Sequence, residues 1–108
     1  MRLLFLYGSL LDAALFRRIA GVPLAGLPAV LAGWRRVAMT HGPYPTLRRD
    51  AGSMVEGLLV QVDGRAFVKL CDYEGPRWRR REVVAVVDGR RVVAQAWIAA
   101  GGSRKPWP

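Results

Sequence analysis

The stretch that decides the fold is Leu4-Phe5-Leu6-Tyr7-Gly8-Ser9-Leu10. An apolar run that ends at a glycine and a small hydroxyl residue is typical of a buried strand followed by a tight loop. A helix is predicted directly afterwards, over Ala13–Ala20, with Asp12 as its N-cap and Gly21 at its end. Backbone N–H groups at such a junction lack partners, and the helix dipole adds partial positive charge, so the loop suits an anion such as a carboxylate. A turn that only reverses the chain would show the same residue types.

The composition is that of one folded domain with a basic surface. The chain has 108 residues, 52% of them hydrophobic, and this length supports a single core. We place the domain at residues 1–100 and expect a flexible tail at residues 101–108. The net charge is +9, carried by 15 Arg and 2 Lys. This charge permits contact with nucleic acid, but it is equally compatible with an arginine-rich surface that has no polyanionic partner.

The sequence also indicates where the protein is found. The lone Cys71 excludes an intrachain disulfide, so we expect a reducing compartment, the cytoplasm. Gly8-Ser9 and Asp12 interrupt the N-terminal apolar run too early for a signal peptide. No stretch approaches the roughly 18 apolar residues of a membrane helix, so we expect a soluble protein without membrane contact.

The rest of the chain predicts mostly strands. Asp88-Gly89 between β-branched runs is a strong signal for a two-residue hairpin turn. Residues 22–28 are expected to form a surface connection, residues 40–45 a loop, and residues 50–52 a turn. A second short helix is predicted over residues 66–73, and strands are predicted over residues 29–39, 46–49, 53–63 (with a bulge or bend at Gly57), 78–87 and 92–99. The pattern indicates an α+β fold, a small mixed β-barrel of about six strands with short flanking helices, because closure removes exposed strand edges.

Three glutamates are the candidate acid–base residues. Glu82 lies among arginines and is expected to be a solvated ion-pair partner, and Glu56 is expected to face outward from an apolar strand. Glu74 follows an apolar helix and precedes Gly75-Pro76, so it lies where an element ends and can point into a cleft. An ordinary helix-end carboxylate would occupy the same position.

Other catalytic chemistries find little support. One His (His41) and one Cys (Cys71) cannot supply the three or four ligands of a zinc site, and Cys71 on an apolar helix face is typical of a buried, inert thiol. Nucleotide-binding glycine motifs and the nucleophile elbow are absent, and Ser9 has no evident base partner. We therefore expect neither a metal nor a cofactor.

A basic run, Arg77-Trp78-Arg79-Arg80-Arg81, is the candidate nucleic-acid patch. Side chains alternate on a strand, so Trp78 and Arg80 share one face while Arg79 and Arg81 share the other. The run is therefore no continuous basic stripe, and we expect a solvated face with one inward pair.

Taken together, the chain resembles the gamma-glutamylcyclotransferase-like family. The resemblance rests on four matches in order, spread over about residues 4–98: Tyr7-Gly8-Ser9-Leu10, Tyr44-Pro45, Val55-x-Gly57, and Cys71-Asp72-Tyr73-Glu74-Gly75 followed by Trp78, Arg80 and a valine-rich strand. It implies a small barrel with a cavity at one end and a small-molecule gamma-glutamyl substrate. It also implies that Glu74 is the general acid/base, that the loop Tyr7, Gly8, Ser9 and Leu10 binds the glutamyl group, and that Tyr44 and Trp78 contribute to substrate binding.

The implied reaction is the cyclisation of a gamma-glutamyl amide to 5-oxoproline with release of the free amine. Two departures from the family pattern are visible: Trp78 stands where the family usually has tyrosine, and the chain lacks insertions found in members that act on larger or glutathione-like substrates. Two alternatives remain open at this point. One is a non-catalytic barrel of the same fold that binds a small ligand, and the other is a basic nucleic-acid-binding protein.

Overall fold

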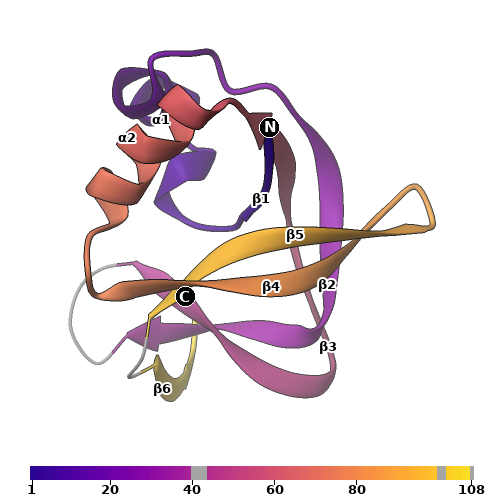
Figure 1. The fold of residues 1–108 in the computed structure, drawn as a ribbon. Helices are drawn as coiled ribbons and strands as arrows, with labels where there is room; N and C mark the ends of the chain where they lie inside the picture. Colours follow the sequence, from indigo (N-terminus) through magenta and orange to yellow (C-terminus); the bar gives the residue numbers. More distant parts are fainter. Residues whose placement is uncertain (40–43, 100–101, 108) are drawn as a thin grey trace.

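The protein is a five-stranded barrel with an extra strand and two helices (Figure 1). The computed structural model describes residues 1–39, 44–99 and 102–107. Within those ranges the elements are β1 (Arg2–Leu6), the 3-10 turn η1 (Ser9–Leu11), α1 (Ala13–Ala20), β2 (Gly26–Met39), β3 (Pro45–Val62), α2 (Gly64–Glu74), β4 (Trp78–Val87), β5 (Arg90–Ala99) and β6 (Gly102–Pro106).

The strand order closes the sheet into a barrel. The order is β3-β1-β5-β4-β2-β6, and an additional pairing between β2 and β3 joins the two ends of the five-stranded part. β1 runs parallel to β5, whereas its pairing with β3 and the β2–β3, β2–β4 and β4–β5 pairings are antiparallel. The mixed barrel with flanking helices predicted from the sequence is thus confirmed.

Strand β1 is apolar from Leu3 onward, and its last three residues are buried on both faces of the strand. Phe5 and Tyr7 point into the barrel, while Leu4 and Leu6 point to the helices, as alternation along a strand requires. The residues buried inside the barrel are Phe5, Tyr7, Ala29, Leu31, Trp34, Leu47, Val55, Leu59, Val83, Ala85, Val87, Ala94, Ala96 and Ile98. Those buried between barrel and helices are Leu4, Leu6, Leu10, Phe16, Ala20, Val60, Val62, Ala66, Phe67, Leu70 and Trp97.

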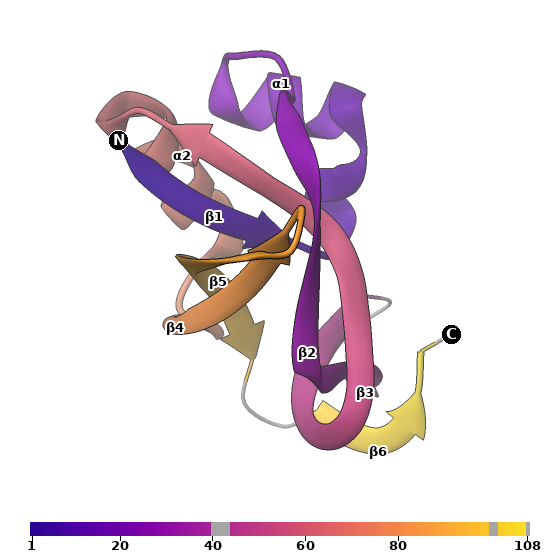
Figure 2. The same ribbon diagram turned by 90° about the vertical axis from the view of Figure 1, so that its right-hand side faces the viewer.

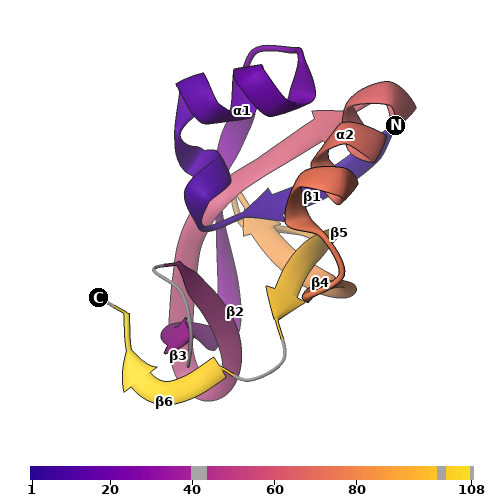
Figure 3. The same cartoon turned by 90° about the vertical axis from the view of Figure 1, so that its left-hand side faces the viewer.

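Both helices lie against each other on one side of the barrel (Figures 1 and 3). α1 has the predicted bounds, with the Asp12 carboxylate accepting a hydrogen bond from the N–H of Leu15 at 3.0 Å. α2 begins earlier than expected because Asp63 caps it in the same way, accepting from the N–H of Ala66 at 2.8 Å. Neither helix has the length and apolar character needed to cross a bilayer, within the residues that the structure describes.

The β2–β3 ribbon differs from the prediction. Residues 45–62 form one strand instead of two strands separated by a turn, and β2 begins at Gly26, within the segment expected to be a surface connection. The ribbon bends sharply at a register shift next to Gly33, where Gly33 and Gly52 both have positive φ (Figure 2). Gly57 carries no bulge: it pairs regularly with Ala29.

Gly57 is required for close packing. A Cβ at this position would overlap the carbonyl oxygen of Leu6 and lie 2.8 Å from the ring of Phe5. The glycine therefore lets β3 approach the end of β1, directly before the predicted binding loop.

The C-terminal region contains one confirmed and one wrong expectation. β4 and β5 form the predicted hairpin, with Asp88 and Gly89 at φ of 49° and 75°, as a type I′ turn requires. Within the expected flexible tail of residues 101–108, Gly102–Pro106 instead form β6 and pair with β2 beyond its contact with β4 (Figure 2). Edge pairing uses main-chain groups, so it leaves little trace in side-chain pattern.

Candidate functional site

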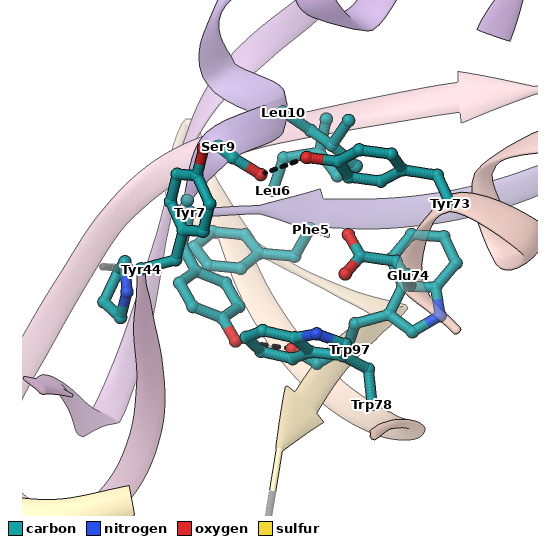
Figure 4. Close-up of a pocket in the computed structure, with 12 residues that line it drawn as sticks. Phe5, Leu6, Tyr7, Ser9, Leu10, Tyr44, Tyr73, Glu74, Trp78 and Trp97 are labelled. Carbon is teal, nitrogen blue, oxygen red and sulfur yellow. Dashed lines mark hydrogen bonds between the residues drawn. The ribbon is translucent and has the colours of Figure 1, made fainter. Parts of the chain in front are cut away.

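A cavity of about 250 Å³ opens where β1 ends and α2 ends (Figure 4). All seven residues predicted from the sequence line it. The full lining is Phe5, Leu6, Tyr7, Gly8, Ser9, Leu10, Tyr44, Pro45, Tyr73, Glu74, Trp78 and Trp97. The fold thus brings residues from β1, η1, β3, α2, β4 and β5 to one place.

The loop after β1 forms one wall of the cavity. The N–H groups of Leu11 and Asp12 donate to the carbonyl oxygens of Gly8 and Ser9 at 3.0 and 3.1 Å, which closes the 3-10 turn. The N–H groups at the start of a helical turn are not used by its internal hydrogen bonds. The Ser9 hydroxyl lies 3.2 Å from the hydroxyl of Tyr73, so the loop is joined to α2 across the cavity.

Tyr7 anchors this wall in the barrel. Its hydroxyl donates a hydrogen bond to the carbonyl oxygen of Trp97, and its own carbonyl oxygen accepts one from Nε of Arg36 at 3.0 Å. Burial raises the pKa of Tyr7 well above its usual value of 10. The phenol therefore stays neutral and serves as a fixed support for the loop.

Glu74 is the last residue of α2, and its carboxylate points into the cavity (Figure 4). Gly75 ends the helix with a φ of 72°, and its N–H donates to the carbonyl oxygen of Cys71 at 3.0 Å. Burial raises the pKa of Glu74 from its usual 4.5 to about 7. At neutral pH the carboxyl group is thus poised between its two protonation states.

The two aromatic residues predicted to bind substrate lie at different depths. Trp78, the first residue of β4, is half-buried and packs against the cluster beneath the helices. Tyr44 is exposed at the rim next to Pro45. The aromatic cavity therefore has an apolar floor and an open edge.

The competing candidates lie elsewhere. Glu56 and Glu82 are exposed as expected, and Cys71 is half-buried. His41 lies outside the described residues, so the His41–Cys71 pair is not part of this description. No group of three potential metal-ligating side chains occurs in the described ranges.

The basic run behaves only partly as predicted. Trp78 turns inward, but Arg80 on the same face is exposed, and its guanidinium stacks over the ring of Phe67 at 4.9 Å. Arg79 and Arg81 are exposed on the other face. Of the two residues predicted to face inward, only Trp78 does so.

Three aromatic residues that line the cavity were not predicted from the sequence: Phe5, Tyr73 and Trp97. Phe5 and Tyr73 flank the predicted motifs, so their proximity along the chain was an available signal. Trp97 gave none, because only the parallel pairing of β1 and β5 brings it to the site.

The sequence pattern of the family described as "Gamma-glutamyl cyclotransferase, AIG2-like" matches residues 4–107. The chain belongs to this family. None of the curated proteins matches the chain.

Solved structures show the same fold. A protein from Arabidopsis thaliana has a TM-score of 0.83 at 23% identity, with 99% of this chain and 69% of that chain covered. A gamma-glutamyl cyclotransferase has a TM-score of 0.83 at 16% identity, covering 94% and 68%. An AIG2-like protein from Mus musculus has a TM-score of 0.68 at 18% identity, covering 96% and 80%. At these identities the likeness is one of fold.

Proposed function

We propose that this member of the family is a gamma-glutamyl cyclotransferase. In the reaction, the α-amine of a gamma-glutamyl compound attacks its own γ-carbonyl carbon. A new C–N bond closes the five-membered ring of 5-oxoproline, and the original amide C–N bond breaks to release the amine. The observation that carries the proposal is a half-buried glutamate facing the backbone loop of residues 7–10 across one small cavity.

The proposed reaction requires the protein mainly to position the substrate and to transfer protons. The nucleophile and electrophile belong to the same molecule, so holding the folded-back conformer provides a proximity effect. An aromatic cavity of about 250 Å³ suits a compact, folded glutamyl group better than an extended one. Because the substrate supplies both reacting groups, the proposed reaction needs no cofactor.

Glu74 is assigned both proton transfers. It accepts the proton that the α-ammonium loses and then donates it to the nitrogen of the departing amine. A free carboxyl group with a pKa of about 4.3 is a poor match for an α-amine near 8, whereas a pKa of about 7 brings the two close together. The raised pKa thus supports the assignment.

The loop of Gly8, Ser9 and Leu10 is assigned the anionic part of the substrate. Its backbone N–H groups would hold either the α-carboxylate or the oxyanion that develops on the carbonyl. Tyr44 at the rim and Trp78 at the floor are assigned apolar contact with the substrate. With one cysteine in the chain, we place the protein in the cytoplasm.

The experiment is to measure 5-oxoproline release from a panel of gamma-glutamyl amino acids, gamma-glutamyl-lysine isopeptide and gamma-glutamyl amines. Glu74→Gln should abolish release, while Glu56→Gln, which changes an exposed glutamate outside the cavity, should leave it unchanged. A substrate with an acetylated α-amine should not react, because its nucleophile is blocked.

Two outcomes would overturn the proposal. Full activity in a folded Glu74→Gln protein would remove the acid–base assignment. Binding of these compounds without any product would instead identify a ligand-binding barrel of the same fold.

A further inference from the structure

A second hollow adjoins the cavity at the loop of residues 7–9. Its volume is about 560 Å³, and it shares Tyr7, Gly8, Ser9, Tyr44 and Pro45 with the cavity. Its remaining walls are Leu11, Asp12, Leu15, Arg36 and Trp107. We name this hollow the Arg36 groove, because Arg36 is its cationic residue.

Two backbone carbonyl groups fix the position of the Arg36 guanidinium. Its Nε–H donates to the carbonyl oxygen of Tyr7 at 3.0 Å, and an N–H of its Nη2 donates to the carbonyl oxygen of Glu56. A guanidinium carries five N–H donors, so these two bonds fix its position and leave further donors for a ligand.

The charge of Arg36 lacks a protein counter-ion. No carboxylate within the described part of the chain forms an ion pair with it. Asp12 also lines the groove, but it forms no ion pair with Arg36, and one of its carboxylate oxygens accepts the N-cap hydrogen bond from the N–H of Leu15. A half-buried cation has lost part of its hydration, and backbone carbonyls replace that hydration without neutralising the charge. An anion bound in the groove would neutralise it, and a carboxylate matches the planar donors of arginine.

We infer that Arg36 selects gamma-glutamyl substrates whose departing amine carries a carboxylate, such as gamma-glutamyl amino acids. The inference rests on the proposed function and names the substrate class of the same site. The groove adjoins the cavity along the loop of residues 7–9, so a substrate whose glutamyl half lies in the cavity beside Glu74 can extend its amine half past the loop into the groove. Tyr44 and Trp107 supply apolar walls for that half.

The test compares gamma-glutamyl-alanine with gamma-glutamyl-alaninamide, two compounds of nearly the same shape that differ by one negative charge. The native protein should favour the acid in kcat/KM by about tenfold or more, equivalent to about 1.4 kcal/mol. Arg36→Gln should bring the two values together. Arg79→Gln removes the same charge from an exposed position outside the groove, and should keep the preference.

The ratio of kcat/KM for the two substrates distinguishes substrate selection by Arg36 from structural support of the loop by Arg36. Loss of Arg36 could also displace the carbonyl of Tyr7, but that would lower kcat/KM for both compounds by the same factor. An equal loss for acid and amide would overturn the inference and make Arg36 a positioning residue. A native protein without preference would overturn it as well.

Binding keeps this test independent of turnover. Calorimetry on the Glu74→Gln protein should give the same preference for the acid, and the Arg36→Gln, Glu74→Gln double variant should lose it. A binding preference in a native protein that makes no 5-oxoproline would leave the role of Arg36 standing and reject the proposed function. Equal binding of both compounds, or binding of neither, would reject the role of Arg36.

Discussion

Replacing Glu74 should stabilise the protein at high pH while abolishing its activity. The folded state holds the proton of Glu74 up to a pKa of about 7, whereas the usual carboxyl value is 4.5. Between these two values the folded state binds more protons than the unfolded state, so stability falls as pH rises. The effect is absent below about pH 4.5, grows up to about pH 7 and is constant above it.

The size of the effect follows from the same two values. Their difference corresponds to about 3.5 kcal/mol at most, at about 1.4 kcal/mol for each pH unit. Because Glu74 is only half-buried and solvent screens part of its charge, we expect about 1–3 kcal/mol. Glutamine has nearly the shape of the protonated acid but does not titrate, so Glu74→Gln should gain this amount at pH 8 and almost nothing at pH 4.

Urea unfolding of native and Glu74→Gln proteins at pH 4, 6 and 8 measures the difference directly. Other titrating groups contribute equally to both proteins and cancel. The exposed Glu56→Gln provides the matched control and should show no pH-dependent gain. A Glu74→Gln effect that is the same at pH 4 and pH 8 would refute the argument that burial holds the proton.

Three further predictions concern the backbone around the site. Gly57→Ala should destabilise the protein by about 3 kcal/mol in urea unfolding, because its Cβ would overlap the carbonyl oxygen of Leu6. Gly64→Ala, where a Cβ meets open space at the start of α2, is its control, and equal stabilities for the two variants would contradict this account. Thr46→Val should cost about 1–3 kcal/mol, because the buried hydroxyl bonds both backbone groups of one residue in β5; Thr46→Ser should restore most of it, and a neutral valine variant would argue against that link. Gly8→Val should weaken substrate binding, measured as a raised KM, more than it destabilises the fold, measured as a lowered Tm. The added Cβ would have only Pro45 nearby, at 4.0 Å, but the side chain would occupy space where the ligand binds. An unchanged KM would count against the loop as a binding site.

Local chemistry made much of the fold predictable. Asp12 and Gly21 fixed the bounds of α1, and Asp88-Gly89 fixed the hairpin, because each of these residues favours one backbone geometry. The unbroken β3 and the pairing of β6 were not predictable. Both depend on which strand edges meet in space, and a glycine such as Gly52 carries the same signal in a turn as in a bulged strand.

The residues of the site also divide into those that the local sequence indicates and those that only the fold brings together. Gly8 and Glu74 stood out because each lies near the end of a predicted element, and the fold brings them to one cavity. The raised pKa of Glu74 could not be predicted, since it depends on walls such as Trp97 that come from a distant strand. Arg36 was hidden as one of fifteen arginines, and only its hydrogen bond to the loop distinguishes it.

The parallel pairing of β1 with β5 has a consequence for how the protein is made. The hydroxyl of Tyr7 donates its hydrogen bond to the carbonyl oxygen of Trp97, which lies 90 positions further along the chain. At about 5–20 residues per second, a ribosome needs roughly 5–20 s to deliver that partner. Of the two strands that pair with β1, β3 is made about midway through this interval and β5 only at its end. β5 is the last of the five barrel strands to be made and it carries Trp97 of the cavity lining, so a nascent chain can have both helices and the β2–β3 ribbon before it has a complete site.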